Sequence, residues 1–149
     1  MLIFITKLPD LHGFDTTMVV VDSVSKQGHF IPTHTMVTAL GAAQLYLQHV
    51  WKLHGLLRST LSDRGSQFII KFMHELYCLL GSSILSSMAY HPQSDGQTRC
   101  MNQELKQYIH IFVNKHQDNW DTLLLLGEFA YNNHTHLSTQ HSPFFMDTG

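Results

Sequence analysis

The chain has 149 residues, 44% of them hydrophobic, which is enough for one compact domain with an apolar core. Nine basic and eleven acidic residues give a net charge of −2, which excludes a domain that grips nucleic acid mainly through a strongly basic surface. No apolar run approaches the roughly 20 residues of a membrane-spanning helix, and no secretory signal is recognisable. We therefore expect a soluble, intracellular protein with no membrane partner.

The first half of the chain predicts paired strands and then two helices. Apolar and β-branched runs at 17–24 and 28–33, separated at Gly28, are typical of a strand pair. A helix is expected from an N-cap at Thr38 to a stop at Gly55. A short strand at 59–63 ends on Asp63, and an amphipathic helix then runs to Gly81.

The second half predicts a strand at 82–87, a turn-forming loop, and a helix over 97–116 with an apolar stripe at Met101, Leu105, Tyr108 and Phe112. A last helix begins near Trp120, and most of its leucines are expected to be internal. Two strands followed by strands alternating with helices predict an α/β fold, a single mixed sheet flanked by helices over 1–149.

Cysteines and histidines give no metal-binding pattern. The two cysteines form neither a disulfide framework nor a CxxC pair, which fits a reducing compartment. The close histidine pairs lack the further ligands that a zinc site requires: His134 with His136, and His49 with His54. Ordinary surface or core histidines are the favoured interpretation.

Asp63 is the first candidate for chemistry, because it follows a strand, and side chains at the carboxyl edge of a sheet project into a crevice. The simpler alternative is that Asp63 begins a turn with Gly65 or caps the following helix. The residues around Asp63 decide between the two.

The sequence resembles the integrase catalytic core of gypsy-type long-terminal-repeat retrotransposons, which is related to retroviral integrases and has a ribonuclease-H-like fold. The resemblance extends over essentially the whole chain. It is carried by a series of short motifs in the same order and spacing: FITKLP at 4–9, MVVVDSVSK at 18–26, HFIPT at 29–33, WKLHG at 51–55, SDRGSQF at 62–68, AYHPQSDGQT at 89–98, NQEL at 102–105 and EFAYNN at 128–133.

The resemblance implies polynucleotidyl transfer by three carboxylates that hold two Mg²⁺ or Mn²⁺ ions. Separate elements must supply them, because a two-metal site shares one carboxylate and receives the others from elsewhere. The family's second acid is retained as Asp63. The first position carries Ile3 and the third carries Arg99. The first strand also looks truncated at Met1, so the chain resembles a fragment.

Two missing acids predict a catalytically disabled copy. Glu104, five positions beyond Arg99, points about 140° away on a helix and cannot replace the third acid. The Arg99 guanidinium is permanently cationic and would pair with Asp63 where a metal should bind. We therefore expect any metal at Asp63 to be weak, and no Mg²⁺ or Mn²⁺ to be held stably.

Two remaining roles are weighed. The first is weak DNA binding, predicted by a polar surface that resembles the DNA-facing surface of the family. The expected location would then be the nucleus. A solvated helix face explains the same polar residues equally well. The polar surface comprises Arg99, Gln103, Lys106, His91 and Gln97. The alternative is a non-catalytic self-association or protein-interaction module, in which the apolar segment 120–131 forms a homodimer.

Overall fold

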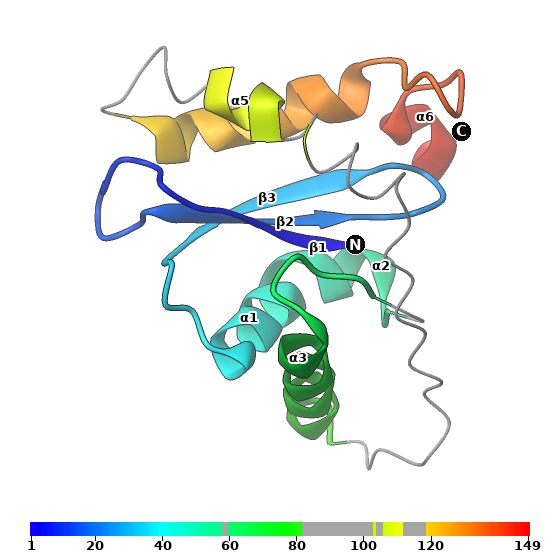
Figure 1. The fold of residues 1–149 in the computed structure, drawn as a ribbon. Helices are drawn as coiled ribbons and strands as arrows, with labels where there is room; N and C mark the ends of the chain where they lie inside the picture. Colours follow the sequence, from blue (N-terminus) through cyan, green and yellow to red (C-terminus); the bar gives the residue numbers. More distant parts are fainter. Residues whose placement is uncertain (58–59, 82–102, 104–105, 112–118) are drawn as a thin grey trace.

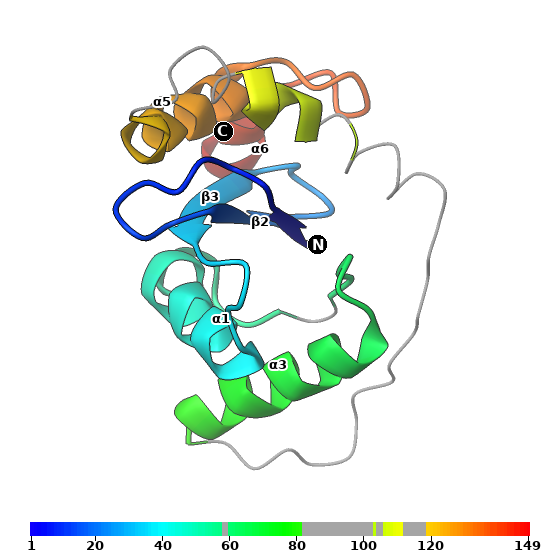
Figure 2. The ribbon, with the colours of Figure 1, turned by 60° about the vertical axis from the view of Figure 1, so that its left-hand side comes forward.

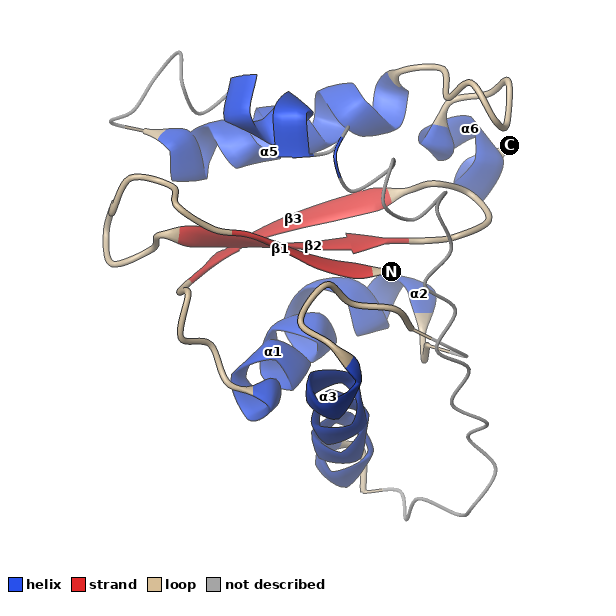
Figure 3. Ribbon diagram, viewed as in Figure 1, coloured by secondary structure: helices blue, strands red, loops and turns tan. Residues whose placement is uncertain are grey.

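The computed structural model describes residues 1–57, 60–81, 103, 106–111 and 119–149. These residues form three layers, with a sheet between two groups of helices (Figures 1 and 3). One face is covered by α1 (Ala39–Tyr46) and α3 (Ser66–Leu79), and the other by α5 (Trp120–Asn133). In the part of the chain that is described, no helix is long and apolar enough to cross a membrane.

The sheet consists of β1 (Leu2–Ile5), β2 (Thr16–Val21) and β3 (Gly28–Thr33) in the antiparallel order β1-β2-β3. The free edge of β1 makes a parallel contact with Ser62, and the Leu2 N–H donates to the Leu61 carbonyl at 2.7 Å. The pairing is therefore mixed, as expected. However, the expected strand at 59–63 is reduced to this contact in its described residues, and the expected strand at 82–87 lies outside them.

The strand expected at 17–24 is shorter than predicted. It ends at Val21 because the Asp22 carboxylate accepts hydrogen bonds from the N–H groups of Val24 and Ser25, at 3.0 and 2.7 Å. A carboxylate that binds the backbone two and three residues ahead favours a turn over an extended strand. The prediction at 28–33 is confirmed.

Alternate residues of the strands enter two separate cores, because successive side chains point to opposite faces of a sheet. Leu2 and Phe4 belong to the core shared with α1 and α3. Ile3 and Ile5 belong to the core shared with α5, which includes Trp120. The two views in Figures 1 and 2 both place α1 and α3 together on one side of the sheet.

The predicted helices are mostly confirmed. Thr38 caps α1, and Gly55, with φ of 72°, ends the region, but the single expected helix divides into α1, a π-helical turn (Leu47–Trp51) and α2 (Lys52–His54). Helix α3 ends just before Gly81. Of the helix expected at 97–116, residues 103 and 106–111 are described and helical.

Two details of the C-terminal region differ from expectation. Helix α5 begins at Trp120 as predicted, but Leu125 and Leu126 are exposed rather than internal, while Leu124 is buried. A short helix that the sequence did not suggest, α6 (Pro143–Thr148), starts where the Ser142 hydroxyl accepts a hydrogen bond from the Phe145 N–H and proline takes the first helical position.

Candidate functional site

Asp63 lies in the turn between the Leu2–Ser62 contact and the start of α3. Both of its carboxylate oxygens lie 3.3 Å from the backbone nitrogen of Phe4, which donates to them from the neighbouring strand β1. Its carboxylate does not cap α3, whose N-cap is Gly65 with no side-chain hydrogen bond. Asp63 is therefore directed at the sheet.

The ammonium group of Lys106 is the cationic partner of this carboxylate. Lys106 Nζ lies 3.7 Å from Asp63 Oδ2, and the two side chains are 44% and 22% exposed. Burial raises the pKa of the Asp63 carboxyl above its ordinary value, while the Phe4 N–H and Lys106 act in the opposite direction. The hydrogen bond from Phe4 and the attraction of Lys106 therefore offset only part of the cost of removing the charged carboxylate from water.

The side chain of Ile3 is completely buried on the face of the sheet that packs against α5. The amide nitrogen that contacts Asp63 belongs to the peptide bond joining Ile3 to Phe4, so the two positions are adjacent through the backbone. Ile3 itself shares its core with Ile109, from the helical segment 106–111, and with Trp120. It offers hydrocarbon at the position of the first acid.

The third acid position, Arg99, lies outside the described residues, as do His91 and Gln97. Gln103 is exposed, and Lys106 is partly exposed but turned to Asp63. In the described part of the chain, the cation that pairs with Asp63 is Lys106.

Arg64 holds the Asp63 turn in place, a role the sequence did not reveal. Its guanidinium donates to the carbonyls of Val37 and Thr35, both at 2.8 Å, and lies 3.8 Å above the centre of the Phe4 ring. A planar fork of donors that also stacks on an aromatic ring is a combination that lysine cannot reproduce. Arg64 ties the connection between β3 and α1 to the residue next to Asp63.

Glu128 and Asn132 are two further residues that the motifs contained but did not explain. Asn132 is buried and exchanges two hydrogen bonds with the backbone of Gly28, both at 2.8 Å. Glu128 accepts from the Phe30 N–H at 2.8 Å. These side chains, four positions apart on α5, provide hydrogen-bond partners for backbone groups at the outer edge of β3. No strand covers this edge in the described part of the chain. Their spacing of four positions, which places both on one face of a helix, was the feature of the sequence that could have revealed this shared role.

The described donors do not fit a pair of Mg²⁺ ions. Such a site needs several carboxylate oxygens from separate elements, whereas Asp63 faces an ammonium group and Ile3 supplies no oxygen. Within the residues whose structure is given, no three histidine, cysteine or acidic side chains converge on a common point. The environment of Asp63 suits an internal ion pair.

The fold has clear relatives among solved structures. The HTLV-2 integrase catalytic core domain, determined in complex with magnesium in a trimeric form, superposes with a TM-score of 0.59 over 95% of this chain and 99% of that one, at 14% sequence identity. At this identity the likeness establishes the fold alone. No family model matches the sequence.

Curated relatives are found among retrotransposon polyproteins. The Tf2-3, Tf2-4 and Tf2-5 transposon polyproteins of Schizosaccharomyces pombe are each 30% identical over 141 residues, which is 95% of this chain. The chain spans 11% of the length of these relatives.

The three layers form an α/β fold of the ribonuclease-H-like type, the fold of the HTLV-2 integrase catalytic core. In sequence, the chain is related over 95% of its own length to transposon Tf2 polyproteins.

Proposed function

We propose that this domain is a catalytically disabled integrase core. The proposal depends most on one observation: the carboxylate of Asp63 is engaged by Lys106 and by the Phe4 N–H, beside a strand in which position 3 is a buried isoleucine. The magnesium in the HTLV-2 core supports Mg²⁺ as the ion an active relative would use. In this chain a divalent ion would have to displace an ammonium group and then rely on very few oxygen ligands.

Catalysis by two metals requires that one ion activates the attacking oxygen while the other stabilises the leaving oxygen. A single carboxylate holds Mg²⁺ weakly, because this ion keeps most of its waters and prefers several oxygen ligands in octahedral array. The Lys106 cation adds electrostatic repulsion to that weakness. Together these factors should remove strand transfer rather than merely slow it.

A strand-transfer assay tests the proposal. The purified domain is incubated with Mg²⁺ or Mn²⁺ and labelled duplex oligonucleotides, beside an Asp63→Asn variant. We expect both proteins to give the same background. Strand transfer by the parent that disappears in Asp63→Asn would overturn the proposal.

Weak binding of duplex DNA is proposed as a retained activity, with an intracellular and nuclear location as its corollary. Support comes from the exposed Gln103 and the half-exposed Lys106, neighbours on a helical segment whose family counterpart faces DNA. The ion pair with Asp63 reduces what Lys106 can contribute. Affinity should fall steeply as salt increases, and Lys106→Gln should flatten this dependence. Binding that is independent of salt, or absent at low salt, would favour a merely solvated helix face.

Self-association is a second candidate function, favoured by a specific observation. The outer face of α5 exposes three large apolar side chains, Leu125 at 70%, Leu126 at 61% and Phe129 at 59%. Contiguous apolar surface of this kind commonly marks an interface. The trimeric form of the HTLV-2 core is consistent with association among related cores.

Sedimentation velocity distinguishes this role. The parent should sediment as an oligomer, and Leu125→Lys with Phe129→Lys should sediment as a monomer. The matched control is Leu137→Lys, since Leu137 is 85% exposed but lies beyond α5. A monomeric parent, or an equal effect of the control, would eliminate the interface.

A further inference from the structure

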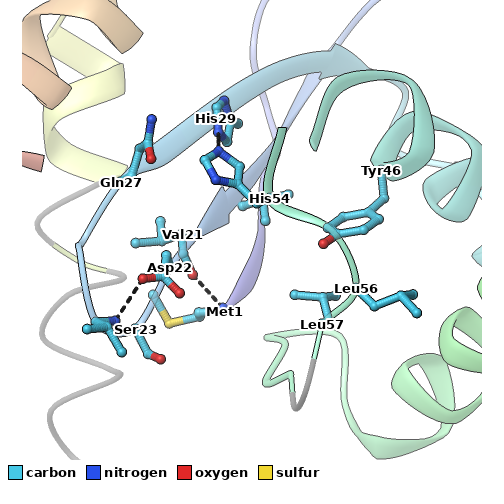
Figure 4. Close-up of a pocket in the computed structure, with 12 residues that line it drawn as sticks. Met1, Val21, Asp22, Ser23, Gln27, His29, Tyr46, His54, Leu56 and Leu57 are labelled. Carbon is cyan, nitrogen blue, oxygen red and sulfur yellow. Dashed lines mark hydrogen bonds between the residues drawn. The ribbon is translucent and has the colours of Figure 1, made fainter. Parts of the chain in front are cut away.

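Two histidines from distant parts of the sequence meet beside a cavity. His29 lies on β3 and His54 at the end of α2, and their Nε2 atoms are 2.8 Å apart. Both side chains line a cavity of about 420 Å³ that is also bordered by Tyr46, Asp22 and Leu56 (Figure 4). The pair is independent of Asp63 and of the proposed loss of catalysis.

A carboxylate faces the opposite nitrogen of each ring. His29 Nδ1 lies 3.1 Å from Glu128 Oε1, and His54 Nδ1 lies 4.0 Å from Asp147 Oδ1. Asp147 is beyond hydrogen-bond distance of His54, whereas the Glu128 carboxylate at His29 Nδ1 favours the tautomer of His29 that carries hydrogen there and leaves its Nε2 lone pair free. It also makes the imidazole a stronger ligand, which is the arrangement commonly found behind metal-bound histidines. In the 2.8 Å contact the other ring, His54, carries its hydrogen on Nε2, and moving that hydrogen to Nδ1 would direct both Nε2 lone pairs toward the same small volume.

The separation of the rings matches a shared ion closely. Two imidazole nitrogens at about 2.1 Å from a tetrahedral Zn²⁺ are roughly 3.4 Å apart. The observed 2.8 Å contact would have to open by only about 0.6 Å, and the ring centres are 5.0 Å apart with the planes inclined at 44°. A small rotation of the exposed partner, His54, whose side chain is 29% accessible, suffices.

We propose that His29 and His54 form a site for one divalent transition-metal ion of the Zn²⁺, Ni²⁺ or Cu²⁺ class. Imidazole suits these ions, whereas Mg²⁺ prefers oxygen. No third histidine, cysteine or acidic ligand converges there within the described ranges, so water from the cavity completes the coordination. The ion joins β3 to the residues that follow α2. Without it, the two rings share a single N–H in a hydrogen bond.

Zinc titration by calorimetry on the intact chain tests the site. We expect one saturable site per chain in the parent and its loss in His54→Gln, which retains a hydrogen-bond donor but is a poor ligand. His49→Gln is the matched control, because His49 is exposed in the adjacent turn. Cys78→Ser removes another source of binding, a separate thiol–imidazole pair on α3 in which Cys78 Sγ lies 3.8 Å from His74 Nδ1. Both controls should bind zinc like the parent.

A second measurement does not depend on the histidine variants. In a protein carrying Cys78→Ser and Cys100→Ser, the electron paramagnetic resonance spectrum of one equivalent of Cu²⁺ should contain splitting from two imidazole nitrogens. Unsaturable binding, equal binding by His54→Gln, or a spectrum with fewer than two nitrogens would overturn the site. Asp63→Asn should leave both signals unchanged, so this result stands apart from the outcome of the strand-transfer assay.

Discussion

Asp63 carries a partly uncompensated charge, and this makes its effect on stability depend on pH. Because burial raises the pKa of Asp63 above its ordinary value of 3.8, its stabilising contribution is present below that pH and is lost as the pH rises through the higher folded-state value. The free energy of unfolding of the parent should therefore fall relative to Asp63→Asn as the pH rises from about 3 toward neutrality.

Urea unfolding of both proteins across this range measures the difference, and a lysine variant separates its causes. Lys106→Met removes the attraction that opposes the raised pKa, so it should steepen the loss of stability with pH. A difference between parent and Asp63→Asn that stays constant with pH would mean that the carboxyl titrates as it does in the unfolded chain.

An aspartate at position 3 would have to be buried. The side chain of Ile3 has 0% exposure and packs in the core shared with α5, so Ile3→Asp would bury an unpaired charge. We expect a loss of about 3–5 kcal/mol in the free energy of unfolding. Ile3→Val, which only removes a methylene, should cost about 0.5–1.5 kcal/mol. Equal losses in thermal or urea unfolding would show that the aspartate escapes to water.

At the scale of elements, α5 is fastened to the edge of β3 by side chains rather than by apolar packing alone. Asn132→Ala should destabilise the domain by about 2–3 kcal/mol, because the buried N–H and C=O of Gly28 both lose their partner. The neighbouring Asn133 is exposed, so Asn133→Ala provides a control with a change of less than about 0.5 kcal/mol. Similar losses in both variants would indicate that helix propensity is responsible.

Periodicity predicted elements well where one face is buried and poorly where local hydrogen bonds decide. The apolar spacing of Phe72 and Leu76 identified α3, and Gly55 correctly ended the first helical region. The end of β2 depended on Asp22 binding backbone groups ahead of it, and the parallel contact of Ser62 depended on β1, so neither followed from local apolar pattern.

At the scale of the whole molecule, the resemblance to a family located the sequence positions of the candidate site. It did not predict which side chains contact one another there, because the residues at those positions differ from those of the family. Asp63 and Ile3 were located from motifs, and the fold brings Asp63 to the peptide bond that follows Ile3. Lys106 was assigned to a DNA-facing surface, yet it pairs with Asp63 across 43 positions of sequence. The His29–His54 contact likewise depends on tertiary packing, which the separation of these residues in the sequence conceals.

If the proposed function is correct, placing acids at all three family positions should create a metal site beside Asp63. In a variant with Ile3→Asp, Arg99→Glu and Lys106→Gln, carboxylates stand at all three family positions and the competing ammonium is absent. The new carboxylates repel one another without metal, so the variant should be less stable than the parent. Mg²⁺ should then raise its unfolding temperature progressively with concentration, because an ion that binds only the folded state stabilises it by mass action.

The parent should show no such rise, and adding Asp63→Asn to the triple variant should abolish it. Mg²⁺ is the appropriate probe because it prefers oxygen ligands and should ignore the histidine pair. A folded triple variant whose unfolding temperature does not respond to Mg²⁺ would mean that more than these three positions separates this domain from an active core. An equal response of the parent would mean that Asp63 binds the ion despite Lys106.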